Sequence, residues 1–168
     1  MESLVRSDSG VVSDAYQALR RDALALIEGE PDWLANLANL AALVFERVEG
    51  LNWAGFYLMR GDELVLGPFQ GRSACVRIAV GRGVCGTAVA ERRSQLVPDV
   101  HAFPGHIACD VRSRSELVVP ITAGDEVVAV LDLDSDRLAR FDEVDRAGFE
   151  ALVAAFTPHI DWQGACRL

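Results

Sequence analysis

Two pairs of short apolar runs, each joined by a Gly-Asp dipeptide, restrict the fold of this chain more than any other sequence feature. Such a dipeptide between apolar runs favours a tight turn, so each pair predicts an antiparallel hairpin. The first pair is 52–59 with 63–69 around Gly61-Asp62, and the second is 115–122 with 126–135 around Gly124-Asp125. A hairpin with an apolar face needs a further layer to cover it, and the flanking segments must supply that layer.

Helical patterns flank the two hairpins. In the two N-terminal segments, apolar residues recur at helical spacing after Ser or Asp residues that can cap a helix. The predicted helices span residues 13–28, 33–48, 84–93 and 142–156, and further strands are expected at 75–80 and 94–100. This order of elements predicts an α+β sandwich around an antiparallel sheet.

The length and hydropathy of the chain suit one folded domain. Its 168 residues are 51% hydrophobic, and no apolar run is long enough to span a membrane. We expect a flexible N-terminal segment at 1–12, a domain over 13–160 and a C-terminal tail at 161–168. The N-terminal residues lack the apolar stretch of a signal peptide, so we expect a cytoplasmic location, where thiols normally stay reduced.

The charge of the chain argues against a nucleic-acid partner. The formal net charge is −9, whereas contacts with phosphates require a basic surface. The four cysteines include no Cys-x-x-Cys pair and the three histidines lack metal-ligand spacing, so no structural metal site is expected either. The sequence leaves open whether the domain forms a homodimer.

Residues 81–86, GRGVCG, match the glycine pattern of a dinucleotide-binding turn between a strand and a helix. The antiparallel hairpins elsewhere do not fit the parallel sheet of such a site, so a tight strand-to-helix turn is the preferred interpretation. That turn would place Cys85 in the first turn of a helix. There the helix dipole should favour the thiolate and lower the pKa of Cys85.

The segment 98–114 carries a cysteine in a setting that neither a helix nor a strand explains. It contains HAFPGHIACD, with two histidines, a Pro-Gly pair and Cys109. Connections of this length in compact domains are usually functional or disordered, and the apolar residues of this one argue against disorder. Cys75 and Cys85 add two further thiols, so redox chemistry is the favoured interpretation. Cys166 lies near the C-terminus and receives no role.

Three acidic residues are predicted to meet at one end of the second hairpin. Asp132 and Asp134 are two positions apart in a strand and point to one face, while Leu131 and Leu133 point to the other. Glu116 begins the partner strand. Crowded carboxyl groups cannot all ionise at low cost, so at least one should have a raised pKa and could protonate a polar oxide near a thiolate. The alternative is a solvated strand edge or a turn cap.

These stretches together resemble the free methionine-(R)-sulfoxide reductases, single-domain enzymes with the GAF fold. The resemblance lies in NWAGFYL, LGPFQGRSACVRIAVGRGVCG, PDVHAFPGHIACD, SELVVPI and VLDLDS, in that order between residues 33 and 156. It implies a GAF-like sandwich with a central antiparallel sheet of about six strands. The N- and C-terminal helices would cover one face, and loops plus a short helix the other. It also implies thiol-dependent reduction of free L-methionine-(R)-S-oxide without a cofactor or a metal.

The resemblance implies roles for three cysteines. Cys109 would be the nucleophile that attacks the sulfoxide sulfur, releases methionine and becomes a sulfenic acid. Cys75 and Cys85 would be the two candidates for the resolving cysteine, which converts this sulfenic acid into a disulfide. Thioredoxin would then reduce the disulfide.

The resemblance also implies a substrate site around these cysteines. Glu116, Asp132 and Asp134 would bind the polar head of the substrate and supply protons. Trp53 and Tyr57 would enclose the methyl-thioether end and could contact the substrate ammonium. Backbone N–H groups would bind the substrate carboxylate, contributed by the loop residues Gly105, His106, Ile107, Ala108 and Cys109. His101 and His106 are interpreted first as residues that order this loop, with an acid/base role as the alternative.

Two other interpretations use the same residues. A GAF-like sensor would bind a small ligand without turnover, and a redox switch would use the cysteines only for its own disulfide. A sensor does not need several loop cysteines beside an acidic cluster, and a redox switch leaves Trp53, Glu116 and the Asp pair unexplained. The enzyme interpretation is therefore preferred, and turnover of methionine sulfoxide with a dithiol would separate the three.

Overall fold

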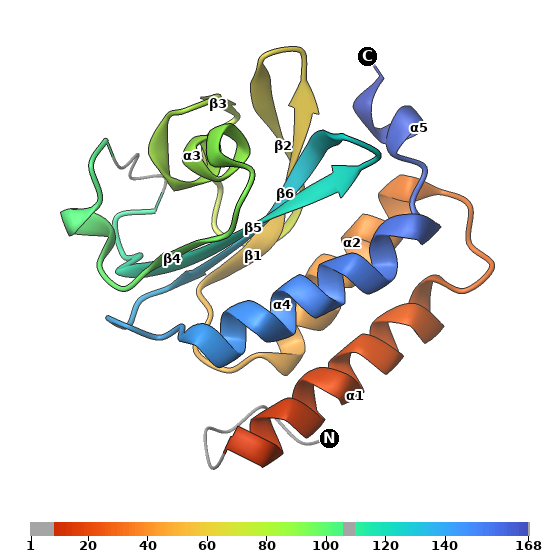
Figure 1. The fold of residues 1–168 in the computed structure, drawn as a ribbon, viewed down its shortest axis with the longest axis horizontal. Coiled ribbons are helices and arrows are strands. Elements are labelled where there is room, and N and C mark those ends of the chain that lie inside the picture. Colours follow the sequence, from red (N-terminus) through yellow and green to blue (C-terminus); the bar gives the residue numbers. More distant parts are fainter. Residues whose placement is uncertain (1–8, 106–109, 168) are drawn as a thin grey trace.

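The computed structural model describes residues 9–105 and 110–167. Within them, six strands form one antiparallel sheet in the order β3-β2-β1-β6-β5-β4 (Figure 1). The strands are β1 (Trp53–Arg60), β2 (Glu63–Gly71), β3 (Arg77–Ala79), β4 (Gln95–Val97), β5 (Ser115–Ala123) and β6 (Glu126–Ser135). Both expected hairpins form, β1–β2 and β5–β6. Their turns place Gly61 and Gly124 at a φ of +63° each, which only glycine adopts without strain.

Helices cover both faces of the sheet. The helices α2 and α4 pack on one face, α1 packs against these two helices on the side away from the sheet, and α3 lies on the opposite face (Figure 1). The helices are α1 (Ser9–Ile27), α2 (Trp33–Arg47), α3 (Gly83–Glu91), α4 (Glu143–Phe156) and α5 (Trp162–Cys166), with 3-10 turns η1 (Val100–Ala102) and η2 (Thr157–His159). This arrangement confirms the α+β sandwich. No helix in the described part of the chain has the length and apolar character that a membrane crossing requires.

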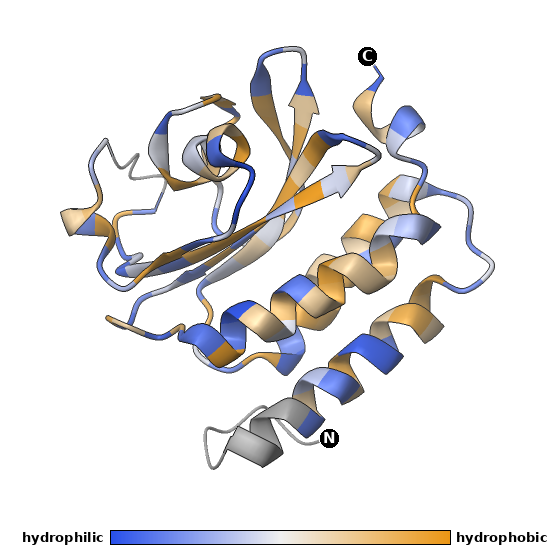
Figure 2. Cartoon of the chain, viewed as in Figure 1, coloured by the Kyte–Doolittle hydropathy of each residue, from blue (hydrophilic) through white to orange (hydrophobic). Residues whose placement is uncertain are grey.

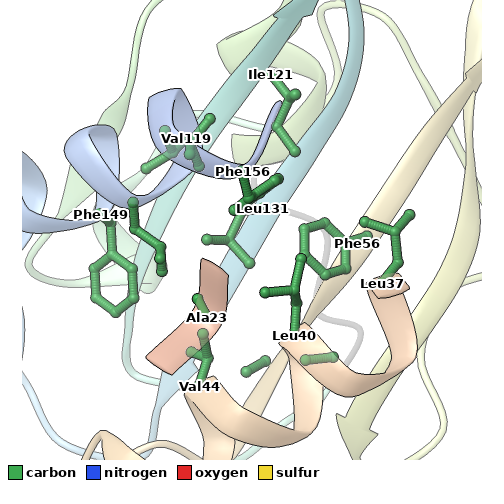
Figure 3. Packing of buried hydrophobic residues seen from close by; sticks show 14 of the residues in the cluster. Ala23, Leu37, Leu40, Val44, Phe56, Val119, Ile121, Leu131, Phe149 and Phe156 are labelled. Carbon is green, nitrogen blue, oxygen red and sulfur yellow. The ribbon is translucent and has the colours of Figure 1, made fainter. Parts of the chain in front are cut away.

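The main core lies between the sheet and the helices α2 and α4, and it continues to α1 on their far side. Strand alternation turns Phe56 and Leu131 to this face, where Leu40 of α2 and Phe156 of α4 meet them (Figure 3). The Phe56 and Phe156 rings contact edge to face with 6.0 Å between their centroids. Hydrophobic residues gather where the layers meet, whereas turn residues are mostly hydrophilic (Figure 2). Each such buried side chain stabilises the fold by roughly 1.5–3 kcal/mol.

The N-terminus of α4 is fixed by a capping box. The Asp142 carboxylate accepts hydrogen bonds from the N–H groups of Val144 and Asp145, and the Asp145 carboxylate accepts one from the Asp142 N–H. Asp145 also accepts a hydrogen bond from the Tyr16 hydroxyl of α1 at 2.7 Å and pairs with Arg140 at 3.3 Å. One carboxylate therefore caps α4 and joins it to α1.

Several expected boundaries are wrong. The helix α1 begins at Ser9 rather than at residue 13, and β3 begins at Arg77, so Cys75 precedes the strand. Residues 162–166 of the expected C-terminal tail form α5, which packs Trp162 and Ala165 into the main core. The Trp162 indole also donates a hydrogen bond to the carbonyl oxygen of Thr157 at 2.9 Å.

Candidate active site

The strand register brings the acidic residues together. Glu116 of β5 pairs with Asp134 of β6, and Asp132 lies two positions before Asp134 on β6. Leu131 and Leu133 belong to the main core on the other face. The predicted alternation is therefore confirmed, and all three carboxyl groups point to the α3 side of the sheet.

A small pocket lies over these carboxyl groups. The described residues that line it are Tyr57, Ile78, Gly83, Val84, Cys85, Asp110, Ser113, Glu116, Asp132 and Asp134. None of these described residues is basic. The pocket is therefore acidic, and it favours a ligand that carries a positive charge at this end.

Burial raises the pKa of all three carboxyl groups. Desolvation is the largest cause at each of them, because a charge is disfavoured away from water. The charge of Asp132 raises the pKa values of Glu116 and Asp134 further. The pKa of Asp132 itself rises to about 6. The prediction of a raised carboxyl pKa is confirmed, and the cluster can hold protons near neutral pH.

Cys85 is a neutral thiol in this pocket rather than a thiolate. It lies in the first turn of α3, is only 3% exposed, and donates from Sγ to Oε1 of Glu116 at 3.9 Å. Desolvation raises the pKa of Cys85, and the charges of Asp132 and Glu116 raise it further. The expectation that the helix dipole lowers this pKa is wrong, because burial among acids outweighs the dipole.

The GRGVCG glycines form the expected tight turn. The N–H of Gly81 donates to the carbonyl oxygen of Gly86 at 2.8 Å, and Gly81 and Gly83 have φ values of +80° and +60°. A Cβ on Gly86 would lie 2.4 Å from the carbonyl oxygen of Ala79. The glycines thus let β3 and α3 approach closely, which places Cys85 over the carboxyl groups.

Tyr57 lines the pocket, whereas Trp53 lies beside it. The Tyr57 hydroxyl donates to the carbonyl oxygen of Cys75 at 3.0 Å, and burial raises the pKa of Tyr57. The Trp53 indole stacks between Tyr57 and Phe69, with centroid distances of 5.9 and 5.2 Å. Its Nε1 donates to the carbonyl oxygen of Arg72 at 3.0 Å. The structure therefore places Tyr57, and not Trp53, at the pocket wall.

The described cysteines differ in state. Cys75 is disulfide-bonded, whereas Cys85 and Cys166 carry free thiols. The hydrogen bond from the Tyr57 hydroxyl to the backbone of Cys75 places Cys75 close to the pocket. Cys166 lies in α5, where its Sγ is 3.4 Å from the carbonyl oxygen of Val128, and it does not line this pocket.

The predicted nucleophile loop falls partly outside the described residues. His106, Ile107, Ala108 and Cys109 lie there, so their predicted roles stay predictions. Before them, Gly105 occupies a turn at a φ of +73° and does not line the pocket. The carboxylate of Asp99 caps η1 by accepting the backbone N–H of His101 at 3.0 Å, a bond that does not involve the imidazole, so the predicted role of His101 stays a prediction.

Sequence reasoning missed a polar network at the edge of the pocket. The Asn52 Nδ2 donates to Oδ2 of Asp110 at 3.3 Å and to Oγ of Ser113 at 3.1 Å. Ser113 in turn hydrogen-bonds the Asp134 carboxyl group. The side chain of Arg112 binds Asp110 at 2.8 Å, and this contact is the main reason that the pKa of Asp110 falls to about 2.

Two signals for this network were present in the sequence. Asp110 directly follows Cys109, and Asn52 directly precedes the aromatic strand β1. Neither position has a periodic pattern that predicts a partner. Only the register of β1 with β6 brings the start of β1 beside the end of β6, where the backbone N–H of Asn52 donates to the carbonyl oxygen of Asp134 at 3.0 Å.

One group of described side chains has the spacing of metal ligands. Cys85, Glu116 and Asp132 each offer one ligand atom, and these atoms all lie within 4.8 Å of one another. All three residues are buried. The combination of one sulfur and two oxygen atoms is chemically different from the all-oxygen sites of Mg²⁺ and Ca²⁺.

Comparisons with known proteins identify the family. Residues 35–161 match the model of the GAF domain. Over 142 residues the chain is 54% identical to the free methionine-R-sulfoxide reductase of Escherichia coli (strain K12), a match that covers 84% of this chain and 86% of that protein. The chain belongs to the free methionine-R-sulfoxide reductase family. The members of this family are oxidoreductases that act on sulfur.

Two further free methionine-R-sulfoxide reductases support this membership. The enzyme of Saccharomyces cerevisiae is 44% identical over 135 residues, which are 76% of this chain and 75% of that protein. The X-ray structure of the Neisseria meningitidis enzyme in complex with its substrate has a TM-score of 0.87 and 41% identity, with 99% of both chains covered. The family resemblance and the GAF fold predicted from the sequence are thus confirmed.

Proposed function

We propose that this protein reduces free L-methionine-(R)-S-oxide to L-methionine, with Cys109 as the nucleophile and thioredoxin as the final reductant. The observation that carries the proposal is a buried acidic pocket beside Cys75. It occurs in a chain that is 54% identical to a free methionine-R-sulfoxide reductase. A cytoplasmic location is part of the proposal, because each cycle needs a compartment that returns the disulfide to thiols.

The acidic pocket suits the ammonium group of a free amino acid. Glu116, Asp132 and Asp134 present carboxyl oxygens, and no basic residue among the described lining competes for them. The ring of Tyr57 forms part of the wall and can contact the methyl-thioether end. The loop around residues 105–109 would bind the substrate carboxylate through its N–H groups. A substrate held at both termini must be a free amino acid.

The proposed reaction transfers one oxygen atom and then removes it as water. The Cys109 thiolate attacks the sulfoxide sulfur while Glu116 protonates the sulfoxide oxygen, methionine leaves, and the oxygen remains on Cys109 as a sulfenic acid. The Cys75 thiol then attacks the sulfur of this sulfenic acid, which forms the disulfide and releases water. A thioredoxin dithiol reduces the disulfide by exchange and becomes oxidised itself.

The state of the described cysteines supports Cys75 as the resolving residue. Cys75 is disulfide-bonded, whereas Cys85 is a free thiol with a raised pKa. Attack on a sulfenic acid needs a thiolate, and a thiol buried among acids rarely supplies one. Cys75 is half-exposed, which also leaves its disulfide open to an external reductant.

The decisive experiment compares free and peptide-bound substrates. Purified protein with thioredoxin, thioredoxin reductase and NADPH should turn over free methionine-(R)-sulfoxide. Its kcat/KM should be lower by a factor on the order of 10⁴ for the same sulfoxide inside a blocked peptide, because buried polar groups of the site would then lack partners. Similar rates on both substrates would contradict the proposal. Binding of the free sulfoxide without any turnover would favour a GAF-type sensor.

A further inference from the structure

The three buried ligand atoms near Cys85 fit a single metal ion. The Cys85 Sγ and Glu116 Oε1 are 3.9 Å apart, and each of the two lies within 4.8 Å of an Asp132 oxygen. Sulfur and oxygen ligands of a tetrahedral zinc ion are separated by roughly 3.5 Å, given metal bonds of about 2.3 and 2.0 Å. Metal binding therefore requires side-chain rotations that bring the three ligand atoms closer together.

A second observation concerns one oxygen atom of Asp132. The Asp132 carboxyl group hydrogen-bonds Cys85 and Glu116, but its Oδ1 is buried without a hydrogen-bond partner among the described residues, and Asp132 as a whole is only 6% exposed. Asp132 lines the pocket, and the described lining contains no basic residue. A buried carboxylate oxygen without a partner is costly, so a bound cation would stabilise it.

The ligand set selects the class of cation. A thiol adds little to an ammonium site, and Mg²⁺ and Ca²⁺ prefer oxygen ligands alone. One sulfur with two carboxylate oxygens suits a borderline or soft divalent ion such as Zn²⁺ or Cd²⁺. Three protein ligands in a pocket also leave a fourth position for water, as in zinc sites that remain open.

We propose that this pocket binds one thiophilic divalent cation, Zn²⁺ or Cd²⁺, through Cys85, Glu116 and Asp132. The Cys85 thiol gives its proton to solvent as the metal–sulfur bond forms, and no electrons are transferred. The cation occupies the carboxyl groups that we assign to the substrate ammonium. Metal and substrate therefore exclude each other, a consequence that rests on the proposed function, whereas metal binding itself does not.

The test uses the full chain with a single thiol. The chain has four cysteines, so the changes Cys75→Ser, Cys109→Ser and Cys166→Ser leave Cys85 alone. Titration with Cd²⁺ should give the ultraviolet charge-transfer band of a cadmium–thiolate bond, which saturates at one ion per chain. Added Zn²⁺ should remove the band and Mg²⁺ should not. An absent band, or equal displacement by Mg²⁺, would overturn the proposal.

Ligand variants in the single-thiol chain identify the site. Cys85→Ala should abolish the band, and Glu116→Gln should weaken Cd²⁺ binding by about a hundredfold, since loss of an outer-shell partner alone costs 10–100-fold. Asp110→Asn is the matched control, because Asp110 lines the same pocket but pairs with Arg112. Its affinity should match the parent, and an equal loss here would show general charge attraction instead.

Circular dichroism and thermal unfolding show that each variant is folded, and Cys85→Ser replaces Cys85→Ala if that chain does not fold. No sulfoxide turnover enters these measurements, so their failure is distinct from failure of the proposed function. Free methionine added to the wild-type chain then tests the competition. After correction for the Zn²⁺ that methionine itself chelates, measured in a titration without protein, the affinity of the chain for Zn²⁺ should fall, whereas an unchanged affinity would place the metal away from the substrate carboxyl groups.

Discussion

At the scale of single residues, the three carboxyl groups share one environment but have different neighbours. Glu116 faces the Cys85 thiol, while Asp134 accepts a hydrogen bond from Ser113. The alternation of Asp132 and Asp134 and their approach to Glu116 could be predicted from the sequence. The burial of Cys85 could not, because it depends on how α3 packs against the sheet. Local position in a helix was therefore a poor guide to the pKa of this thiol.

Replacement of Glu116 by Gln separates proton donation from binding. The amide keeps the shape and a hydrogen bond but cannot release a proton in the required way. If Glu116 protonates the sulfoxide oxygen, the single-turnover rate of methionine release should fall by roughly 10²–10⁴-fold. Substrate affinity should change much less. Rapid quench with detection of free methionine measures the rate, and a variant that loses only affinity would assign Glu116 to binding alone.

Removal of Asn52 should disturb the pocket through its neighbours. Asn52→Ala deletes the two hydrogen bonds that hold Asp110 and Ser113. A displaced Ser113 no longer lowers the pKa of Asp134, so this pKa should rise and the pH profile of kcat/KM should move to higher pH. The loss of stability should be about 1–3 kcal/mol.

Asn36→Ala is the control for Asn52→Ala. Asn36 is buried and donates to the carbonyl oxygen of Glu30 at 2.8 Å, and it does not line the pocket. This variant should be destabilised in urea without a shift of the pH profile. A shift of equal size in both variants would mean that the profile responds to stability and not to Asp134.

At the scale of elements, the turn chemistry predicted the hairpins, and the apolar periodicity predicted the long helices. The ends of elements were less predictable. The helix α5 exists because Trp162 and Ala165 fill the main core, and a five-residue segment has no periodic pattern that reveals this contact. The same limit applies to β3, which is only three residues long. Tertiary packing, rather than local propensity, decides these short elements.

The elements that carry Cys75 and Cys85 predict different roles for the two thiols. Cys75 lies in the connection before β3, whereas Cys85 is enclosed by α3 and the sheet. Cys75→Ser should release roughly one methionine per chain in a burst and then cycle slowly with thioredoxin. Cys85→Ala should keep most of its steady-state rate. Mass spectrometry of the oxidised chain and NADPH consumption measure these outcomes, and the reverse pattern would make Cys85 the resolving residue.

At the scale of the whole molecule, the strand order joins segments that are far apart in the sequence. The central pairing of β1 with β6 matches Gly55 with Asp132 and Trp53 with Asp134. No local pattern predicts this pairing, and the family resemblance was the only sequence signal for it. The pairing makes the site unfavourable for folding free energy, because it buries three carboxyl groups between the sheet and α3. The site is therefore maintained at the expense of stability.

This cost predicts how stability depends on pH. The carboxyl groups of Glu116, Asp132 and Asp134 have raised pKa values in the folded state, and that of Asp132 rises from 3.8 to about 6. The folded state thus binds more protons than the unfolded chain between these values. The extra proton binding therefore stabilises the folded state fully only at a pH below the ordinary carboxyl pKa. This stabilisation is lost as the pH rises through 6 and beyond. For Asp132 alone the change corresponds to roughly 3 kcal/mol.

Urea unfolding between pH 5 and pH 8 measures this dependence. The free energy of unfolding of the wild-type chain should fall as the pH rises, and Asp134→Asn should flatten the fall and stabilise the chain at pH 8. Asp110→Asn should change the fall much less, since the pKa of Asp110 is lowered to about 2, its carboxylate stays ionised throughout this range, and its charge is the smallest of the causes that act on Asp134. Cation binding at the cluster should restore stability at pH 8, because a ligand that binds only the folded state stabilises it. A free energy of unfolding that stays constant or rises with pH in the wild-type chain would contradict this prediction. It would show that these carboxyl groups are ionised in the folded state and that the pocket contains a partner that balances their charge.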